Sequence, residues 1–184
     1  VDKSNGAIAE AHGTGFVVSS DGYVLTAGHL FEGMDTTTSV FGRVGSRYAV
    51  EREELEIISI SRNPDGALLK FRNTGRSRLP VTLGNPSTME DGSVLYVMGF
   101  PGKEEWFQDQ GSLSGKGGPL GSWSTTISFE PGISGAPVLN DKGQVVAVAW
   151  GGDPDSVGTL NRLLPINLFA SLLRSSGLEV NANP

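Results

Sequence analysis

The chain has 184 residues, 38% of them hydrophobic and 18% charged, which fits one large or two small soluble globular domains. The formal net charge is −6 and the basic residues are scattered, which excludes the electrostatic footprint of a nucleic-acid or anionic-lipid binder. The absence of cysteine excludes disulfide frameworks, thiol catalysis and iron–sulfur clusters.

The amino-terminal segment carries no recognisable targeting signal. Val1–Glu10 lacks the apolar core of a secretion signal, so an exported protein would have lost its signal from this sequence. The longest apolar run, Val145–Trp150, is far shorter than the roughly 20 residues of a membrane-spanning helix. His12 and His29 are the only histidines and fit no zinc-binding spacing. We therefore expect no metal and no cofactor.

Turn residues divide the chain into many short β-type segments. Its 26 glycines and 10 prolines are spread along the whole length, which favours an all-β protein. A spacing of about 8–12 residues between the segments is typical of a barrel or sandwich. In chain order, the predicted strands are Thr14–Ser19, Tyr23–Ala27, Ala49–Val50, Leu55–Ile60, Ala67–Phe71, Val81–Leu83, Val94–Met98, Gln110–Ser114, Thr125–Phe129, Pro137–Leu139 and Gln144–Trp150.

Two segments do not follow the strand pattern. Arg72–Gly92 is polar and rich in turn residues, and we predict that it connects two halves, residues 1–80 and 81–184. Apolar residues recur at helical spacing over Ile166–Leu173, after a proline and before a glycine, which predicts an amphipathic terminal helix.

Ser134 is the first candidate catalytic residue, in the segment Pro131–Pro137 (PGISGAP). Flanking glycines let successive backbone N–H groups point at one spot, as the binding of an oxyanion requires. An ordinary turn fits the same pattern, because a serine hydroxyl becomes a nucleophile only beside a base.

The base and the acid of such a site can be found by elimination. His29 follows a strand-like run, whereas His12 lies in a loop-like stretch where a solvated histidine is expected. Asp65 opens a strongly apolar strand, at a position where a paired carboxylate can be buried. The other acids considered lie in turns or, for Asp35, without an anchoring strand.

The order His29, Asp65, Ser134 distinguishes between the folds that carry such triads. An α/β-hydrolase has the order serine, acid, histidine, and no histidine follows Ser134. A subtilisin-like enzyme has the order acid, histidine, serine on a doubly wound sheet, which the many β-turns oppose. The remaining order is the one used by two-barrel serine proteases.

Three segments resemble the chymotrypsin-like serine protease superfamily, most of all the HtrA/Deg protease domain and its relatives without a PDZ domain. Gly13–Thr26 resembles that family's first hairpin, Asp65–Lys70 its aspartate strand and Gly132–Pro137 its nucleophile loop. The resemblance runs from about residue 13 to residue 173. It implies two packed six-stranded β-barrels with a carboxyl-terminal helix, the histidine and aspartate on the first barrel and the serine on the second.

The same resemblance implies a serine endopeptidase that works through an acyl-enzyme. Ser134 would attack the peptide carbonyl, His29 would carry the proton and Asp65 would orient His29. The backbone N–H groups of Gly132 and Ser134 would bind the oxyanion. Ile133 stands where zymogens of the superfamily carry an aspartate, so we expect no activation by amino-terminal cleavage.

Substrate-binding residues are predicted from their positions relative to Ser134. Ser128 is expected near the base of the primary specificity pocket, where a small neutral side chain favours small or medium apolar residues before the scissile bond. The segment of Ala149, Trp150 and Gly151 resembles the strand that pairs with the substrate backbone. The Trp150 ring would fit a core position as well.

The resemblance also bears on partners and location. We expect the protein to act on polypeptide substrates, to bind no nucleic acid and not to insert into a membrane. We expect it to be located in the periplasm or outside the cell. HtrA-type enzymes commonly form trimers through aromatic residues near the amino terminus. Val1–Ala11 contains no aromatic residue, so we expect a monomer, with a trimer as the alternative.

Two other functions stay open at this stage. A non-catalytic binding module would keep the fold and use the cleft only to capture extended peptides. An enzyme in an inactive resting state would look similar, because rearranged loops can misplace the oxyanion donors. An esterase-like acyl transferase could use the same three side chains. Covalent labelling of Ser134 by a fluorophosphonate separates a working site from a binding module.

Overall fold

The computed structural model describes residues 12–34, 39–45, 51–73, 75–102, 106–152 and 161–178. Within these ranges the chain forms eleven strands, four short 3-10 turns and one short helix, so the all-β prediction is confirmed. The predicted strand Ala49–Val50 and the candidate acid Asp35 lie outside the described residues.

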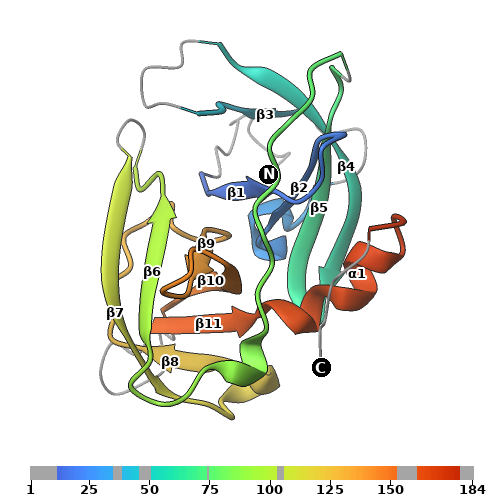
Figure 1. Ribbon diagram of the computed structural model, residues 1–184. Coiled ribbons are helices and arrows are strands. Elements are labelled where there is room, and N and C mark those ends of the chain that lie inside the picture. Colours follow the sequence, from blue (N-terminus) through green and yellow to red (C-terminus); the bar gives the residue numbers. More distant parts are fainter. Residues whose placement is uncertain are drawn as a thin grey trace.

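The first half of the chain forms an antiparallel sheet of five strands. These are β1 (Gly15–Val17), β2 (Tyr23–Thr26), β3 (Val40–Gly42), β4 (Glu53–Arg62) and β5 (Asp65–Phe71). Their order in the sheet is β1-β2-β5-β4-β3, so β5 lies at its centre (Figure 1). The resemblance implied a closed barrel of six strands in this half, whereas the described residues form this open sheet.

The central strand β5 and its neighbour β2 bury side chains on both faces of the sheet. Leu25 and Leu68 belong to a cluster shared with the second half of the chain. Val24 and Leu69, their neighbours in sequence, belong to a cluster on the opposite face. Because side chains alternate between faces, burial on both sides produces the continuous apolar runs that characterise these strands in the sequence.

The second half of the chain forms the closed six-stranded barrel that the resemblance implies. Its strands are β6 (Val94–Gly99), β7 (Phe107–Gly115), β8 (Trp123–Thr125), β9 (Pro137–Leu139), β10 (Val145–Gly152) and β11 (Asn161–Pro165). They close in the order β10-β11-β8-β7-β6-β9. The predicted strand Val81–Leu83 is reduced to a single bridge between Leu83 and Val145, outside the barrel.

The predicted terminal helix begins as a 3-10 turn, Ile166–Phe169, and continues as α1 (Ala170–Arg174). Phe169 and Leu173 are fully buried and pack on the first sheet through the shared cluster. Gly66 on β5 makes room for the Phe169 ring, because a Cβ atom at Gly66 would lie 2.6 Å from the ring.

The connecting segment predicted at Arg72–Gly92 is bonded to both halves. Val81 N–H donates to the carbonyl of Val17 at 2.9 Å, at the end of β1. Gly84 N–H donates to the carbonyl of Val145 at 2.8 Å, at the start of β10. In Figure 1 this segment, drawn in green, runs along the molecule from the β5 end to β6. The connecting segment therefore packs against both the sheet and the barrel through backbone hydrogen bonds, and is not a free linker.

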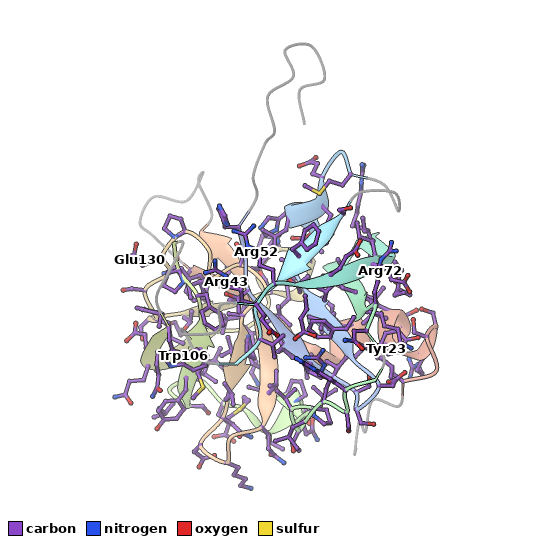
Figure 2. All side chains as sticks on the ribbon, turned by 90° about the horizontal axis from the view of Figure 1, so that it is seen from above. Tyr23, Arg43, Arg52, Arg72, Trp106 and Glu130 are labelled. Carbon is purple, nitrogen blue, oxygen red and sulfur yellow. The ribbon has the colours of Figure 1, made fainter. Side chains whose placement is uncertain are left out.

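Figure 2 shows how the labelled side chains are distributed around these two units. Trp106 and Glu130, from the barrel half, lie on one side of the view, and Tyr23 and Arg72, from the sheet half, lie on the other. The cleft described below takes its lining residues from both halves.

Candidate active site

A cleft of about 980 Å³ is lined by residues of both halves. The sheet contributes His29 and Asp65, and the barrel contributes Ser134 and Trp150. The three side chains that the sequence predicts as a triad therefore line one cavity, although they are far apart along the chain.

His29 and Asp65 are brought together by the pairing of β2 with β5. His29 lies on a 3-10 turn, Gly28–Phe31, that follows β2, and Asp65 is the first residue of β5. Because the two strands are antiparallel, the end of β2 and the start of β5 lie at the same edge of the sheet. The His29 Nδ1 atom lies 2.6 Å from Asp65 Oδ2.

Close approach of the two segments depends on a glycine before the histidine. A Cβ atom at Gly28 would lie 2.7 Å from Asp65 Oδ1 and 2.8 Å from the nitrogen of Gly66. The small residue before His29 is thus required by the carboxylate that the histidine contacts. The Asp65 side chain is 14% exposed and that of His29 is 39% exposed, so the acid is sheltered and the imidazole faces the cleft.

Trp150 supplies a second donor to the same carboxylate oxygen. The indole N–H of this β10 residue donates to Asp65 Oδ2 at 2.8 Å. Asp65 Oδ2 therefore accepts from Trp150 of the barrel and lies within hydrogen-bond distance of His29 of the sheet. An ionised carboxylate oxygen can accept two such bonds. The sequence predicts Trp150 as a substrate contact and does not indicate this partner.

The loop before Ser134 holds its peptide groups in fixed orientations. The N–H of Gly102 donates to the carbonyl of Pro131 at 2.8 Å, and the N–H of Ala136 donates to the carbonyl of Ile133 at 2.8 Å. In a planar trans peptide the N–H points opposite to the carbonyl. The N–H groups of the next residues, Gly132 and Ser134, are thus aimed away from these anchors.

These two N–H groups are the predicted oxyanion donors. Among the described residues, neither Gly132 N–H nor Ser134 N–H donates a hydrogen bond to another protein group. Gly132 has a φ of 103°, and a Cβ atom there would lie 2.8 Å from the carbonyl oxygen of Phe100. Only glycine fits this backbone position, which explains its place in the motif.

Ser134 and His29 line the same cleft without a direct hydrogen bond between them in the described part of the chain. Catalytic hydrogen bonds are often long in the absence of substrate and shorten when it binds. The structure thus contains the His29–Asp65 pair and an anchored serine loop, with the serine–histidine bond unformed.

The remaining predicted site residues have different surroundings. Ser128 is exposed and does not line this cleft; its N–H lies 3.4 Å from Asp109 Oδ2. Ala149 is fully buried, and both its backbone groups are bonded to the serine loop, to Gly135 and to Ala136. Gly151 lines the cleft beside Trp150.

Within the described ranges, no three His, Asp or Glu side chains are grouped as a metal site would require. No helix within those ranges has the length and apolar character needed to cross a membrane.

Two β units that line one cleft, with a histidine and an aspartate on one unit and a serine on the other, are typical of the chymotrypsin-like class of serine peptidases. Residues 13–148 match the family of trypsin-like peptidase domains, and the chain belongs to this family. The sequence-based assignment to a trypsin-like, HtrA-like peptidase domain is confirmed by this match and by the relatives described next.

Similar proteins include two with the name probable periplasmic serine endoprotease DegP-like. The protein from Hahella chejuensis is 33% identical over 149 residues, and that from Ectopseudomonas mendocina is 35% identical over 149 residues. Each alignment covers 76% of this chain and 29% of the relative. The chain thus spans less than a third of the length of these curated relatives.

Two solved structures share the fold. The HtrA-type protease AlgW with a decapeptide has a TM-score of 0.75 at 20% identity, over 89% of this chain and 50% of that one. Deg5 has a TM-score of 0.73 at 22% identity, over 91% of this chain and 83% of that one. The fold class predicted from the sequence, chymotrypsin-like with a terminal helix, is confirmed.

Proposed function

We propose that this domain is a serine endopeptidase whose catalytic residues are His29, Asp65 and Ser134. The observation that carries the proposal is the 2.6 Å contact between His29 Nδ1 and Asp65 Oδ2 in a cleft that Ser134 also lines. A carboxylate on Nδ1 leaves Nε2 of the imidazole as the atom that can accept a proton from the serine.

The reaction proceeds in two acyl-transfer steps. Ser134 Oγ attacks the carbonyl carbon of the substrate while its proton moves to His29 Nε2. The tetrahedral intermediate collapses as His29 returns the proton to the leaving amine, which leaves an ester on Ser134. A water molecule, activated by the same imidazole, then hydrolyses this acyl-enzyme. Asp65 holds the imidazole in position and stabilises its charged form.

The negative charge on the former carbonyl oxygen requires donors that are already oriented. The N–H groups of Gly132 and Ser134 fill this role, since their peptides are held from the carbonyl side. A donor of this kind contributes about 3–4 kcal/mol to transition-state stabilisation. The anchored loop therefore supports an active enzyme over a passive binding module.

The substrates we propose are polypeptides with a small or medium apolar residue before the scissile bond. We place Ser128 near this residue from its position six residues before Ser134, where its side chain would offer no charge for a basic residue. Ser128 does not line the cleft described above, and its N–H lies 3.4 Å from Asp109 Oδ2. A peptide library that varies this residue tests the preference, and selective cleavage after lysine or arginine would assign the pocket to Asp109 instead.

The location that we propose for the protein is outside the cytoplasm, in the periplasm or outside the cell. The relatives of this chain that are named as periplasmic endoproteases support this location.

Fluorophosphonate labelling of the wild-type chain tests the central claim. We expect covalent modification at Ser134, with hydrolysis of an unfolded protein substrate such as reduced casein. The variants S134A and H29A should lose about a million-fold in turnover, and D65N about ten-thousand-fold. Turnover near that of the wild type in S134A or H29A would exclude the mechanism.

The unformed bond between Ser134 and His29 favours one alternative, an enzyme that rests in an inactive state until a peptide binds. In that case labelling would be slow without peptide and would accelerate when a cleavable peptide is added. A chain that binds peptide and is never labelled would instead be a non-catalytic module.

A further inference from the structure

Thr14 is a buried polar residue directly before β1, in the first half of the chain. It is 5% exposed, although its side chain carries a hydroxyl. A buried hydroxyl without partners costs stability, so its contacts indicate what the residue does. Both hydrogen bonds of its hydroxyl lead to loops of the barrel half, one of them the loop that carries Ser134.

The Thr14 hydroxyl bridges two backbone groups of the second half. It donates to the carbonyl of Gly132 at 2.9 Å and accepts from the N–H of Phe100 at 3.0 Å. Gly132 is the first proposed oxyanion donor, and Phe100 follows β6. The two loops that border the oxyanion site are thus joined by one side chain from the other half.

The Thr14 backbone extends the same connection. Its N–H donates to the carbonyl of Ser134 at 2.9 Å, and its carbonyl accepts from the Thr26 hydroxyl at 2.6 Å. Thr26 ends β2, three residues before His29. One residue therefore links the serine loop of the barrel to the strand that carries the histidine.

Together with the anchors described above, these bonds hold four consecutive peptides. Backbone N–H groups of Gly102 and Ala136 donate to the carbonyls of Pro131 and Ile133. The Thr14 hydroxyl donates to the carbonyl of Gly132, and the Thr14 N–H donates to that of Ser134. Of these four anchors, only the hydroxyl of Thr14 belongs to a side chain.

We infer that Thr14 is a positioning residue that keeps the oxyanion donors of Gly132 and Ser134 oriented for catalysis. This inference rests on the proposed function. A hydroxyl bridge that fixes the Gly132–Ile133 peptide limits rotation of the preceding peptide, on which the Gly132 N–H sits. Loss of the bridge lets that N–H turn away from the oxyanion, which affects the transition state more than the bound substrate.

The test compares T14V with T14S. Valine has the shape of threonine without the hydroxyl, and serine keeps the hydroxyl. We expect T14V to lower kcat by about 10- to 100-fold with KM within about threefold, since loosening a donor should cost less than removing one. T14S should stay within about threefold of the wild type in both constants.

A second readout separates positioning from general structural damage. A peptidyl trifluoromethyl ketone with the residue that the wild type cleaves best forms a hemiketal with Ser134. The Oγ–carbon bond forms, the serine proton passes to His29 and the ketone oxygen becomes the oxyanion. Affinity of T14V for this compound should fall by the same factor as kcat/KM. In an S134A background, T14V should bind the uncleaved peptide as tightly as S134A alone.

Thr125 offers a matched control in the barrel. It is 3% exposed, and its hydroxyl also donates to a carbonyl, that of Ser112, and accepts from a backbone N–H, that of Ile127. T125V should lose stability comparably while kcat stays within about threefold of the wild type. If T14V does not fold, T14C takes its place. A thiol is a weaker hydrogen-bond donor than a hydroxyl, so T14C should also lower kcat, but by less than we expect for T14V.

The outcomes distinguish this inference from the function on which it rests. A wild-type chain that is neither active nor labelled contradicts the proposed function. An active wild type, with T14V or T14C equal to T14S in kcat and in ketone affinity, overturns the role of Thr14 and leaves the triad intact.

Discussion

A single oxygen atom of Asp65 lies within hydrogen-bond distance of nitrogen atoms from both halves of the molecule. The His29 Nδ1 atom lies 2.6 Å from Asp65 Oδ2, and the Trp150 indole nitrogen lies 2.8 Å from the same atom. Because the orientation of the imidazole depends on the carboxylate, a donor that fixes the carboxylate also fixes the histidine. Trp150 thus has a defined partner in the absence of substrate.

Replacing Trp150 by phenylalanine removes this donor and keeps an aromatic ring. We expect W150F to lower kcat by about tenfold with little change in KM, since a hydrogen bond to a carboxylate is worth roughly this much. Steady-state kinetics with a peptide substrate measure both constants. W106F changes a tryptophan that is 46% exposed and should match the wild type. A rise in KM alone would show that the ring contacts substrate, as the sequence predicts.

The catalytic candidates could be read from the sequence because each requires a distinctive local pattern. Ser134 lies between glycines whose backbone conformations few other residues can adopt, and Gly28 before His29 leaves room for Asp65. The bond of Trp150 to Asp65 and the contacts of Thr14 could not be found in this way. Their roles depend on hydrogen bonds to residues 85 and 118 positions away, and nothing local distinguishes them from core residues.

At the level of elements, β5 supports both the site and the terminal helix. Asp65 is the first residue of this strand. Gly66 is the second residue and packs against the Phe169 ring. A glycine inside a strand ordinarily weakens it, because it has no side chain to pack. In the structure Gly66 leaves the space into which a buried aromatic ring fits.

The substitution G66A should destabilise the protein by about 1–3 kcal/mol, because the added methyl group overlaps the ring of Phe169. Urea unfolding followed by circular dichroism measures the change. G115A is the matched control, since a Cβ atom at this strand glycine would meet its nearest neighbour at an ordinary 3.5 Å. Equal stability of the two variants would contradict the packing argument.

Arg78, in the connecting segment, makes a nearly buried ion pair with Glu53 of β4. The two side chains are 8% and 15% exposed, and the Arg78 guanidinium bonds both carboxylate oxygens. It also lies 3.9 Å from the centre of the Phe71 ring. The hydrogen bond from Arg78 holds the pKa of Glu53 below its ordinary value, and burial opposes this only in part.

This pair predicts a pH dependence of stability with a defined sign. Since the pKa of Glu53 is lower in the folded state, its contribution is complete above the ordinary glutamate value of about 4.3 and is lost as the pH falls through the lower folded value. E53Q should cost about 1–3 kcal/mol at pH 7 and flatten the acid limb of the stability curve. Urea unfolding at pH 7, 5, 4 and 3 measures both effects.

The exposed pair of Glu54 and Arg72, at 3.4 Å, serves as the control for this prediction. Their side chains are 39% and 55% exposed, so E54Q should change stability by less than about 0.5 kcal/mol. An acid limb as steep in E53Q as in the wild type would assign the pH dependence to other carboxylates.

How far the fold follows from the sequence differs between the two halves. Turn signals and apolar runs located most strands because each strand is bounded by residues with special backbone preferences. The number of strands in a closed unit depends on long-range pairing, which no local pattern encodes. Val81–Leu83 shows this limit: its β-type residues make a single bridge to Val145, because the segment crosses between the halves instead of joining a sheet.

At the scale of the whole molecule, the two halves share one buried cluster. Phe16, Leu25 and Leu68 of the sheet pack with barrel and helix residues that include Val148 and Phe169. The connecting segment, the Thr14 bonds and the Trp150 bond join the same two units. A site built from both halves requires that their relative position be fixed, and this shared core provides it.

We therefore expect the halves to unfold as one cooperative unit, and L69A tests this. Leu69 is buried in a cluster whose members all belong to the first half, and its truncation should cost about 2–5 kcal/mol. All three tryptophans, Trp106, Trp123 and Trp150, belong to the second half. If the unit is cooperative, L69A lowers the urea midpoint of tryptophan fluorescence as much as that of circular dichroism. If the sheet unfolds separately, circular dichroism acquires an earlier phase while the fluorescence midpoint, dominated by the buried Trp123, stays at its wild-type value.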